Sequence, residues 1–315
     1  MRHTACFLAL AALAADACAD QFGSGADAFE IEFVTVGDPG NPADVTGVPN
    51  PAGSVDYSYR IGKYEISESI VEKAITAMGR PLDHSARGPD RPVTNITWID
   101  AARVVNWLNT STGHAPAYKF GGPREAFFEL WAPGDDGYDP ANPYRNTQAK
   151  YFFPTTDEWY KAAYYDPAAG VYYDYATGSN DLPDGIDFAN DPDFEVVRRD
   201  GFGVSQPHEV TNAGVLSPYG TMGQTGNVVE MEESAYDLVN DSTLESRGAR
   251  GGAYFEVDIW LDATWRGQVS PSLGGDPIGF RVASRVPEPG TLAAGLWAAA
   301  TFLALRRRRS ALLAR

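Results

Sequence analysis

Cysteine is almost absent from this chain. Only Cys6 and Cys18 occur among its 315 residues, and both lie near the amino terminus. The long remainder therefore cannot form a disulfide bond, and it offers no thiolate as a nucleophile or as a ligand for a soft metal. Its stability has to come from the packing of the core.

Positive charge is also scarce. The chain has 25 lysines and arginines against 42 aspartates and glutamates, a formal net charge of −17. This argues against nucleic acid as a partner, because a phosphate backbone is bound by a basic surface. An acidic surface is instead suited to cations, to solubility and to extracellular life.

The usual catalytic patterns are missing as well. The histidines after the amino-terminal segment occur singly, without the HExxH or other paired spacing of a zinc or iron site. They are His84, His114 and His208. No serine lies in a nucleophile elbow. The acidic pairs Asp135-Asp136 and Glu232-Glu233 are a weak indication of a glycosidase, since neighbours on a loop need not face one substrate.

The amino-terminal segment has the pattern of a secretory signal peptide. Arg2 precedes an apolar run from Ala5 to Ala15, and the small residues Ala17-Cys18-Ala19 follow. These features predict a signal peptide over residues 1–19 and a mature chain that begins near Asp20.

The carboxyl-terminal segment carries a second targeting pattern. Pro287, Glu288 and Pro289 precede a short apolar run, 291–305, and an arginine cluster, 306–309. The order of these features over 287–309 resembles the PEP-CTERM sorting signal of bacteria that make exopolysaccharide. The resemblance implies processing by an exosortase, only transient contact with the membrane through 291–305, and a final place at the cell surface, in the outer envelope or in the extracellular matrix of a Gram-negative bacterium. An ordinary single-span anchor would give the same topology.

Residues 20–286 read as one acidic, loop-rich domain. They contain 19 basic and 40 acidic residues, a net charge of −21. Alternating apolar residues predict a strand over 29–36, and 57–66 reads as a second strand. Three pairs of capping residues predict helix starts. They are Ser69 with Glu72, Thr97 with Asp100, and Thr155 with Glu158. Residues 110–150 are rich in turn residues and predict a solvated loop.

Three glycine-containing motifs follow one another near the carboxyl end of this domain. They are Gly226-Asn227-Val228-Val229-Glu230-Met231, Arg250-Gly251-Gly252 and Gly279-Phe280-Arg281-Val282-Ala283. Together with RPVTNITW at 91–98 and FPTTDEWYKAAYYDP at 153–167, they resemble the formylglycine-generating enzymes, also called sulfatase-modifying factors. The resemblance covers about residues 59–284 and implies an α+β, C-type-lectin-like fold. Val229 and Met231 stand where the family has tryptophans.

The same resemblance implies calcium as a cofactor. One site would use the side chains of Asn190 and Asp200 with the carbonyls of Asp191 and Phe202. A second would use the carbonyls of Gly226 and Val228 with the side chain of Glu230. That second site departs from the family, because Gly223 stands where an asparagine or aspartate is expected. The alternative is that these residues only form turns.

The family's redox chemistry is not expected here. Its members bind copper(I) through a cysteine pair after the Arg-Gly-Gly motif, and Glu256 and Leu261 align with those cysteines. Neither side chain can replace a thiolate. We therefore assign no catalytic residue and expect no copper and no cysteine-dependent formylglycine formation.

The sequence favours an exported pseudoenzyme that binds a ligand or belongs to the extracellular matrix, with exopolysaccharide or another surface protein as the partner. The candidate ligand-binding residues flank the altered cysteine positions. They are Glu256, Asp258, Trp260, Trp265 and Arg266. Two alternatives stay open: an enzyme of cysteine-independent chemistry with a polar pocket around Glu256, Asp258 and Arg266, and a structural surface or biofilm protein that binds divalent cations.

Overall fold

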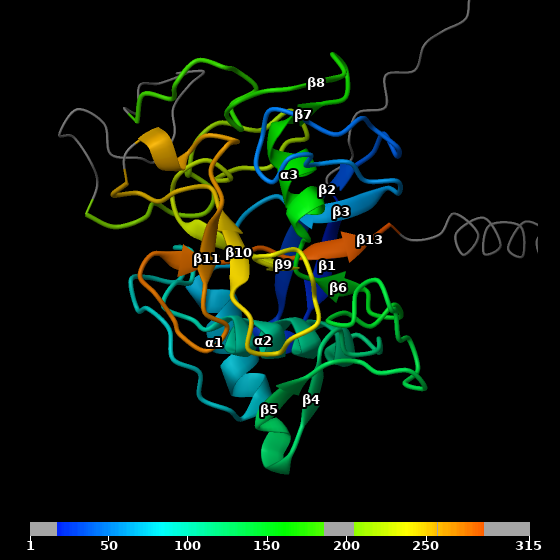
Figure 1. Cartoon of the computed structure of the whole chain (residues 1–315). Helices are drawn as coiled ribbons and strands as arrows, with labels where there is room; N and C mark the ends of the chain where they lie inside the picture. Colours follow the sequence, from blue (N-terminus) through cyan, green and yellow to red (C-terminus); the bar gives the residue numbers. More distant parts are fainter. Residues whose placement is uncertain (1–17, 186–204, 257, 287–315) are drawn as a thin grey trace, which may run out of the picture. The chain divides into compact units, whose positions relative to one another are not determined.

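A computed structural model describes residues 18–185, 205–256 and 258–286 (Figure 1). The chain divides into two compact units, Met1–Ser284 and Arg285–Arg315. Nearly all described residues belong to the first unit. The motif Pro287-Glu288-Pro289 lies outside the described residues, and among those that are described no helix has the length and apolar character needed to cross a membrane.

A five-stranded sheet joins the two ends of the domain. Its strand order is β1-β2-β3-β13-β6. The strands are β1 (Cys18–Phe22), β2 (Phe29–Val36), β3 (Tyr59–Gly62), β13 (Ala283–Arg285) and β6 (Tyr151–Phe152). Strand β2 has the bounds that its alternating pattern predicts, whereas β3 is shorter than the predicted 57–66. Strand β1 begins two residues before the predicted mature start at Asp20, whose carboxylate accepts hydrogen bonds from Arg60 at 2.7 and 3.0 Å.

A four-stranded sheet contains the three glycine motifs. Its order is β11-β10-β9-β12, with β9 and β12 parallel and the other pairs antiparallel. The strands are β11 (Gly267–Val269), β10 (Arg247–Arg250), β9 (Val229–Ala235) and β12 (Ile278–Gly279). The motifs that are 20 to 50 positions apart in sequence are thus neighbours in one sheet, with Glu230 paired to both Arg250 and Gly279.

Three α-helices pack beside these sheets. They are α1 (Glu68–Met78), α2 (Trp98–Ser111) and α3 (Thr156–Tyr164). Helix α1 contacts α2, and α3 contacts β9 (Figure 1). Short hairpins and 3₁₀ turns complete the described fold. They are β4 (Lys119–Gly121) with β5 (Phe127–Glu129), β7 (Tyr165–Asp166) with β8 (Val171–Tyr172), and η1 (Gly25–Asp27), η2 (Pro123–Glu125) and η3 (Asp258–Trp260).

Two of the three predicted helix starts are confirmed. The Thr97 hydroxyl accepts a hydrogen bond from the Asp100 amide at 3.0 Å, and Thr155 with Glu158 forms a complete capping box. The prediction for α1 was wrong by two residues. Its N-cap is Ser67. The Ser67 hydroxyl forms a hydrogen bond with the Ser69 hydroxyl at 3.0 Å and makes no capping bond to the helix backbone. Residues 110–150 are not a plain loop, because they contain the β4–β5 hairpin.

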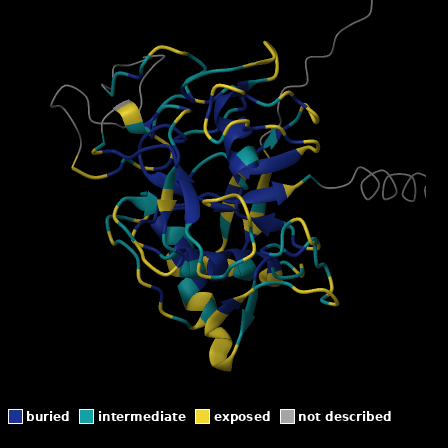
Figure 2. Cartoon of the chain, in the orientation of Figure 1, coloured by how far each residue is buried: buried dark blue, intermediate teal, exposed yellow. Residues whose placement is uncertain are grey.

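The core is rich in aromatic side chains. Trp98 and Trp159 are fully buried, as their helical spacing predicts. Figure 2 shows buried residues concentrated in the sheets and on the inner faces of the helices, with exposed residues in the loops and at the β4–β5 turn. Every residue of β9 is buried, including three glutamates. A strand with buried carboxylates needs matched partners, and it organises the candidate site.

Candidate functional site

Strand β9 places three fully buried glutamates at the centre of the domain. They are Glu230, Glu232 and Glu233. The pairing of β9 with β10 is irregular between Met231 and Ala235, so the partners of each glutamate, rather than simple alternation along the strand, show where its carboxylate lies. An ionised carboxylate without partners is very costly to bury. Each of the three is held by arginine.

The first carboxylate, Glu230, is bound at both oxygens. Arg281 donates from Nε at 2.6 Å and from a terminal nitrogen at 2.5 Å, in a two-point pair with no exposure on either side chain. The indole nitrogen of Trp159 donates at 2.7 Å. The predicted FPTTDEWY helix and the predicted GFRVA segment therefore meet at this glutamate.

The second carboxylate, Glu232, lies between two arginines. Arg250 donates at 2.6 Å, Arg266 at 2.9 Å and the Thr156 hydroxyl at 2.6 Å. Burial alone would raise the pKa of Glu232, but the charges of Arg266 and Arg250 hold it below its ordinary value. Arg266 also donates to the Ala235 carbonyl. Its guanidinium thus belongs to the interior, and the structure does not bring it into a ligand pocket with Glu256.

The third carboxylate, Glu233, faces a separate set of partners. The Tyr118 hydroxyl donates at 2.9 Å, Asn142 at 2.6 Å, and Arg145 lies 3.2 Å away. Burial raises the pKa of Glu233, and the charge of Arg145 only partly offsets this. Since Glu232 and Glu233 accept from different sets of buried donors, they do not form the paired carboxylates of a glycosidase.

Another buried carboxylate, Glu65, is part of this site although no sequence motif pointed to it. Both of its oxygens accept from the Asn227 amide, at 2.9 and 3.0 Å. A β-carbon at Gly223 would lie 3.1 Å from the Glu65 carboxyl group. Glu65 therefore occupies the space into which the expected asparagine or aspartate at position 223 would project. Burial, and then the charge of Glu230, raise the pKa of Glu65 well above its ordinary value.

These contacts bear on the second of the two predicted calcium sites, whereas the first lies outside the described residues. Both Glu230 oxygens already accept from Arg281 and Trp159, so this donor set does not suit the second calcium site, although the carbonyls of Gly226 and Val228 belong to the same turn. Within the described part of the chain, no cluster of three or more His, Cys, Asp or Glu side chains could hold a metal ion. The first site falls outside the described residues and stays a prediction. Its residues are Asn190, Asp191, Asp200 and Phe202.

A family model, described as the sulfatase-modifying factor enzyme 1-like domain, matches residues 34–286. The chain belongs to this family. No protein with a curated description matches it. These findings confirm the predicted family and the predicted C-type-lectin-like α+β fold.

Three solved structures share the fold. Treponema denticola variable protein 1 is 19% identical, with a TM-score of 0.57 and coverage of 85% of this chain and 99% of that one. CarF is 18% identical, with a TM-score of 0.56 and coverage of 87% and 98%. PvdO from Pseudomonas aeruginosa is 16% identical, with a TM-score of 0.52 and coverage of 85% and 98%.

The segment after the Arg-Gly-Gly motif forms a tight loop in this member of the family. Gly252 has a φ of +67°, and a β-carbon there would lie 2.7 Å from the Leu261 side chain and 3.0 Å from the Trp260 carbonyl. Leu261 is fully buried and packs with Tyr175. The loop therefore closes on itself at Leu261, one of the two positions at which we expect the family's cysteines to align.

The other aligned position is Glu256. One oxygen of its half-buried carboxylate is inaccessible to solvent and has no hydrogen-bond partner among the described residues. Burial raises the pKa of Glu256 above its ordinary value. Trp260 and Trp265 lie beside this loop with perpendicular rings 5.2 Å apart, and Asp258 opens η3. The structure therefore brings together the two tryptophans of the predicted ligand set, but not Glu256 and Arg266.

Proposed function

We propose that this protein is an exported binding or matrix protein that uses the family scaffold without the family's thiolate chemistry. The observation that carries the proposal is the loop from Gly252 to Leu261, where a buried leucine and a half-buried glutamate occupy the positions aligned with the cysteine pair. Neither residue can bind copper(I). The buried carboxylates Glu65, Glu230, Glu232 and Glu233 accept hydrogen bonds from interior side chains, so ligand binding falls to the surface and the loops.

Export is part of this proposal and rests on the sequence. The amino-terminal segment 1–19 supports secretion. The Pro-Glu-Pro motif with its apolar run and arginine cluster supports recognition by an exosortase at the surface of a Gram-negative bacterium. An exopolysaccharide-rich matrix is then the medium in which the domain acts, and a polysaccharide is its proposed ligand.

Calcium is proposed for one site, at Asn190 and Asp200 with the carbonyls of Asp191 and Phe202. Carboxylate, amide and carbonyl oxygens on a loop are the ligands that calcium takes. Removing calcium with EDTA is expected to lower the melting temperature of the purified chain, and added calcium is expected to restore it. Asp200→Ala should abolish this response to calcium, and an unchanged response in that variant would contradict the site.

The second candidate function is an enzyme of cysteine-independent chemistry, and Glu256 favours it. One oxygen of this half-buried carboxyl group has no hydrogen-bond partner among the described residues, and burial raises its pKa, which is the direction that suits a general acid. Such an enzyme should lose its activity in Glu256→Gln while keeping its fold.

The test of the proposed function combines metal analysis with two assays of the full chain. We expect no copper, no oxidation of a peptidyl thiol, and binding to the polysaccharide of the producing bacterium. A matched variant, Glu256→Cys with Leu261→Cys, restores the aligned thiols and should gain copper(I) binding. Copper retention with thiol oxidation by the unaltered chain, or failure to bind any polysaccharide, would overturn the proposal.

A further inference from the structure

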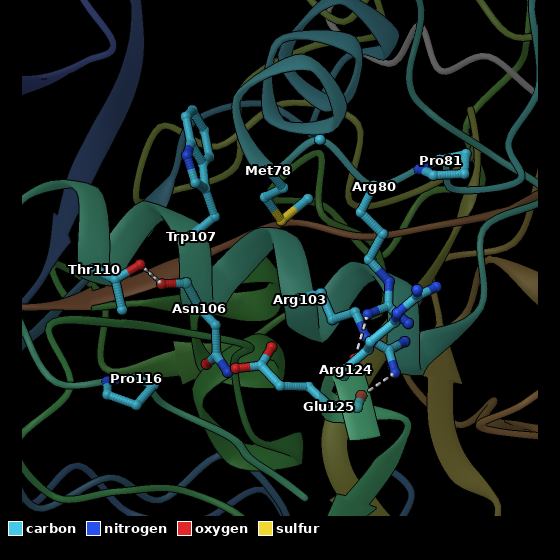
Figure 3. A pocket seen from close by; sticks show the side chains of 11 residues that line it. Met78, Arg80, Pro81, Arg103, Asn106, Trp107, Thr110, Pro116, Arg124 and Glu125 are labelled. Atoms are coloured by element: carbon cyan, nitrogen blue, oxygen red, sulfur yellow. Dashed lines mark hydrogen bonds between the residues drawn. The ribbon is translucent and has the colours of Figure 1, made fainter. Parts of the chain in front are cut away.

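A pocket of about 770 Å³ lies on a part of the domain that the three glycine motifs do not reach. It is bounded by the end of α1, the outer face of α2 and the turn of the β4–β5 hairpin (Figure 3). Its volume falls in the range of small-molecule sites. The three walls come from separate parts of the sequence, so no local motif reveals it.

Three arginines gather on one side of this pocket. Arg80 follows α1, Arg103 lies on α2, and Arg124 lies on the hairpin turn (Figure 3). Arg80 donates to the Arg124 carbonyl at 2.9 Å, and Arg103 donates to the Glu125 carbonyl at 3.0 Å. These bonds fix the hairpin turn against the helices and hold the guanidinium groups near one another.

The positive charges of this cluster are poorly matched. Within the described part of the chain, Asp100 is the one carboxylate that forms an ion pair with any of the three, through Arg103 at 2.7 Å. Arg103 is only 6% exposed, and its Nε has no hydrogen-bond partner among the described residues. Burial, and then the charge of Arg80, lower the pKa of Arg103. Glu125 lines the pocket but makes no ion pair in the described structure.

The remaining wall is suited to a sugar ring. Arg103, Asn106, Trp107 and Thr110 are spaced three and four apart, which puts them on one face of α2. Trp107 stands on the side of the pocket opposite the arginines (Figure 3). The indole is partly exposed and stacks on Phe29 with ring centroids 5.8 Å apart, and the Asn106 amide is bonded to the Tyr118 backbone. The pocket thus combines the exposed part of an indole with a cluster of guanidinium groups, in a space larger than one inorganic anion needs.

We propose that this pocket binds an anionic saccharide, with its carboxylate or sulfate group on the guanidinium groups of Arg80 and Arg124 and its sugar ring against Trp107. Guanidinium groups bind such oxyanions through two parallel hydrogen bonds. An acidic ligand supplies the negative charge that the three arginines lack. This inference rests on the proposed function and names the chemical class of the polysaccharide.

The test is calorimetric titration of the full chain with uronic-acid oligosaccharides, sulfated oligosaccharides, neutral oligosaccharides and sodium sulfate. We expect binding of one acidic class, weaker binding at higher salt and no comparable binding of neutral sugars or free sulfate. Arg124→Ala should weaken binding about tenfold or more, because a charged hydrogen bond is lost. Arg124→Lys should recover only part of the affinity, and Trp107→Ala should weaken binding of the acidic oligosaccharide.

The matched control is Lys63→Ala, which removes the same charge from an exposed pair with Glu32 outside the pocket. It should leave binding unchanged. Equal binding by Arg124→Ala, or equal loss in Lys63→Ala, would overturn the site. Tight binding of neutral oligosaccharides that Arg124→Ala does not change would overturn this inference but leave the proposed function standing. If the chain binds no polysaccharide at all, both this inference and the proposed function are wrong.

Discussion

Arginines are used in opposite ways in two regions of this domain. Beside strand β9, Arg250 of β10 and Arg281, which follows β12, are fully buried, and each donates to a glutamate of β9 at 2.6 Å. In the pocket, Arg80 donates to the backbone carbonyl of Arg124, and neither arginine forms an ion pair with a carboxylate in the described structure. Matched arginines stabilise a polar interior. Unmatched arginines at a surface pocket leave positive charge available to a ligand.

The buried region explains why so much of the family motif is charged. A buried ion pair gains little over a well-packed apolar pair, but removing one partner leaves an uncompensated charge in the interior. Glu230 and Arg281 come from separate motifs, 51 positions apart. The glycine turns beside them bring the strands close enough for these pairs to form. The charged residues of these motifs therefore contribute to the fold itself.

The largest effect is expected at the Glu230–Arg281 pair. Arg281→Met should lower the free energy of unfolding by about 3–5 kcal/mol, because both Glu230 oxygens lose charged donors while fully buried. Urea denaturation of the purified chain measures this loss. A decrease below about 1 kcal/mol would mean that the pair does not hold the two motifs together.

The double variant Glu230→Gln with Arg281→Met separates charge from packing. It removes both charges, so most of the loss in the single variant should be recovered. Glu230→Gln keeps an acceptor for the Trp159 indole, which donates at 2.7 Å. A double variant as unstable as Arg281→Met would show that the methionine fails for reasons of shape.

Local features of this fold could be predicted from the sequence. Thr97 and Thr155 start helices through bonds to residues three positions later, which a spacing rule can see. The strand 29–36 followed from alternation alone. The start of α1 was predicted two residues too late, at Ser69. Ser67 is an equally good N-cap by residue type, and the first turn of α1 begins with Glu68.

The candidate sites could be predicted only in part, because the residues that contact one another in each site are distant in sequence. The motif containing Glu230 was visible, but nothing local showed that Arg281 and Trp159 saturate its carboxylate. Glu65 was missed because its role depends on the empty space above Gly223. The pocket depends on the approach of the β4–β5 hairpin to α1, and the many turn residues of 110–150 concealed this hairpin in the sequence.

A smaller effect, visible as a dependence on pH, is expected at Glu65. Its pKa is raised from an ordinary 4.5 by burial and then by the charge of Glu230. From about pH 4.5 upward the unfolded chain therefore loses this proton while the folded chain keeps it, so Glu65 makes stability fall as pH rises. Glu65→Gln should be relatively more stable at pH 8 than at pH 4, measured against the unaltered chain by thermal unfolding. A difference that shrinks with rising pH would contradict the raised pKa.

The smallest effect is expected at Arg124, and it tests the contrast between the two regions directly. Arg124→Ala should change the free energy of unfolding by less than about 0.5 kcal/mol, because its side chain is exposed and only its backbone carbonyl takes part in the bond from Arg80. The same substitution at Arg250 should cost several times more, since Glu232 would lose a fully buried partner. Urea denaturation of both variants gives the comparison. Equal losses would mean that the pocket arginines also stabilise the fold, and their missing carboxylates would then no longer point to a ligand.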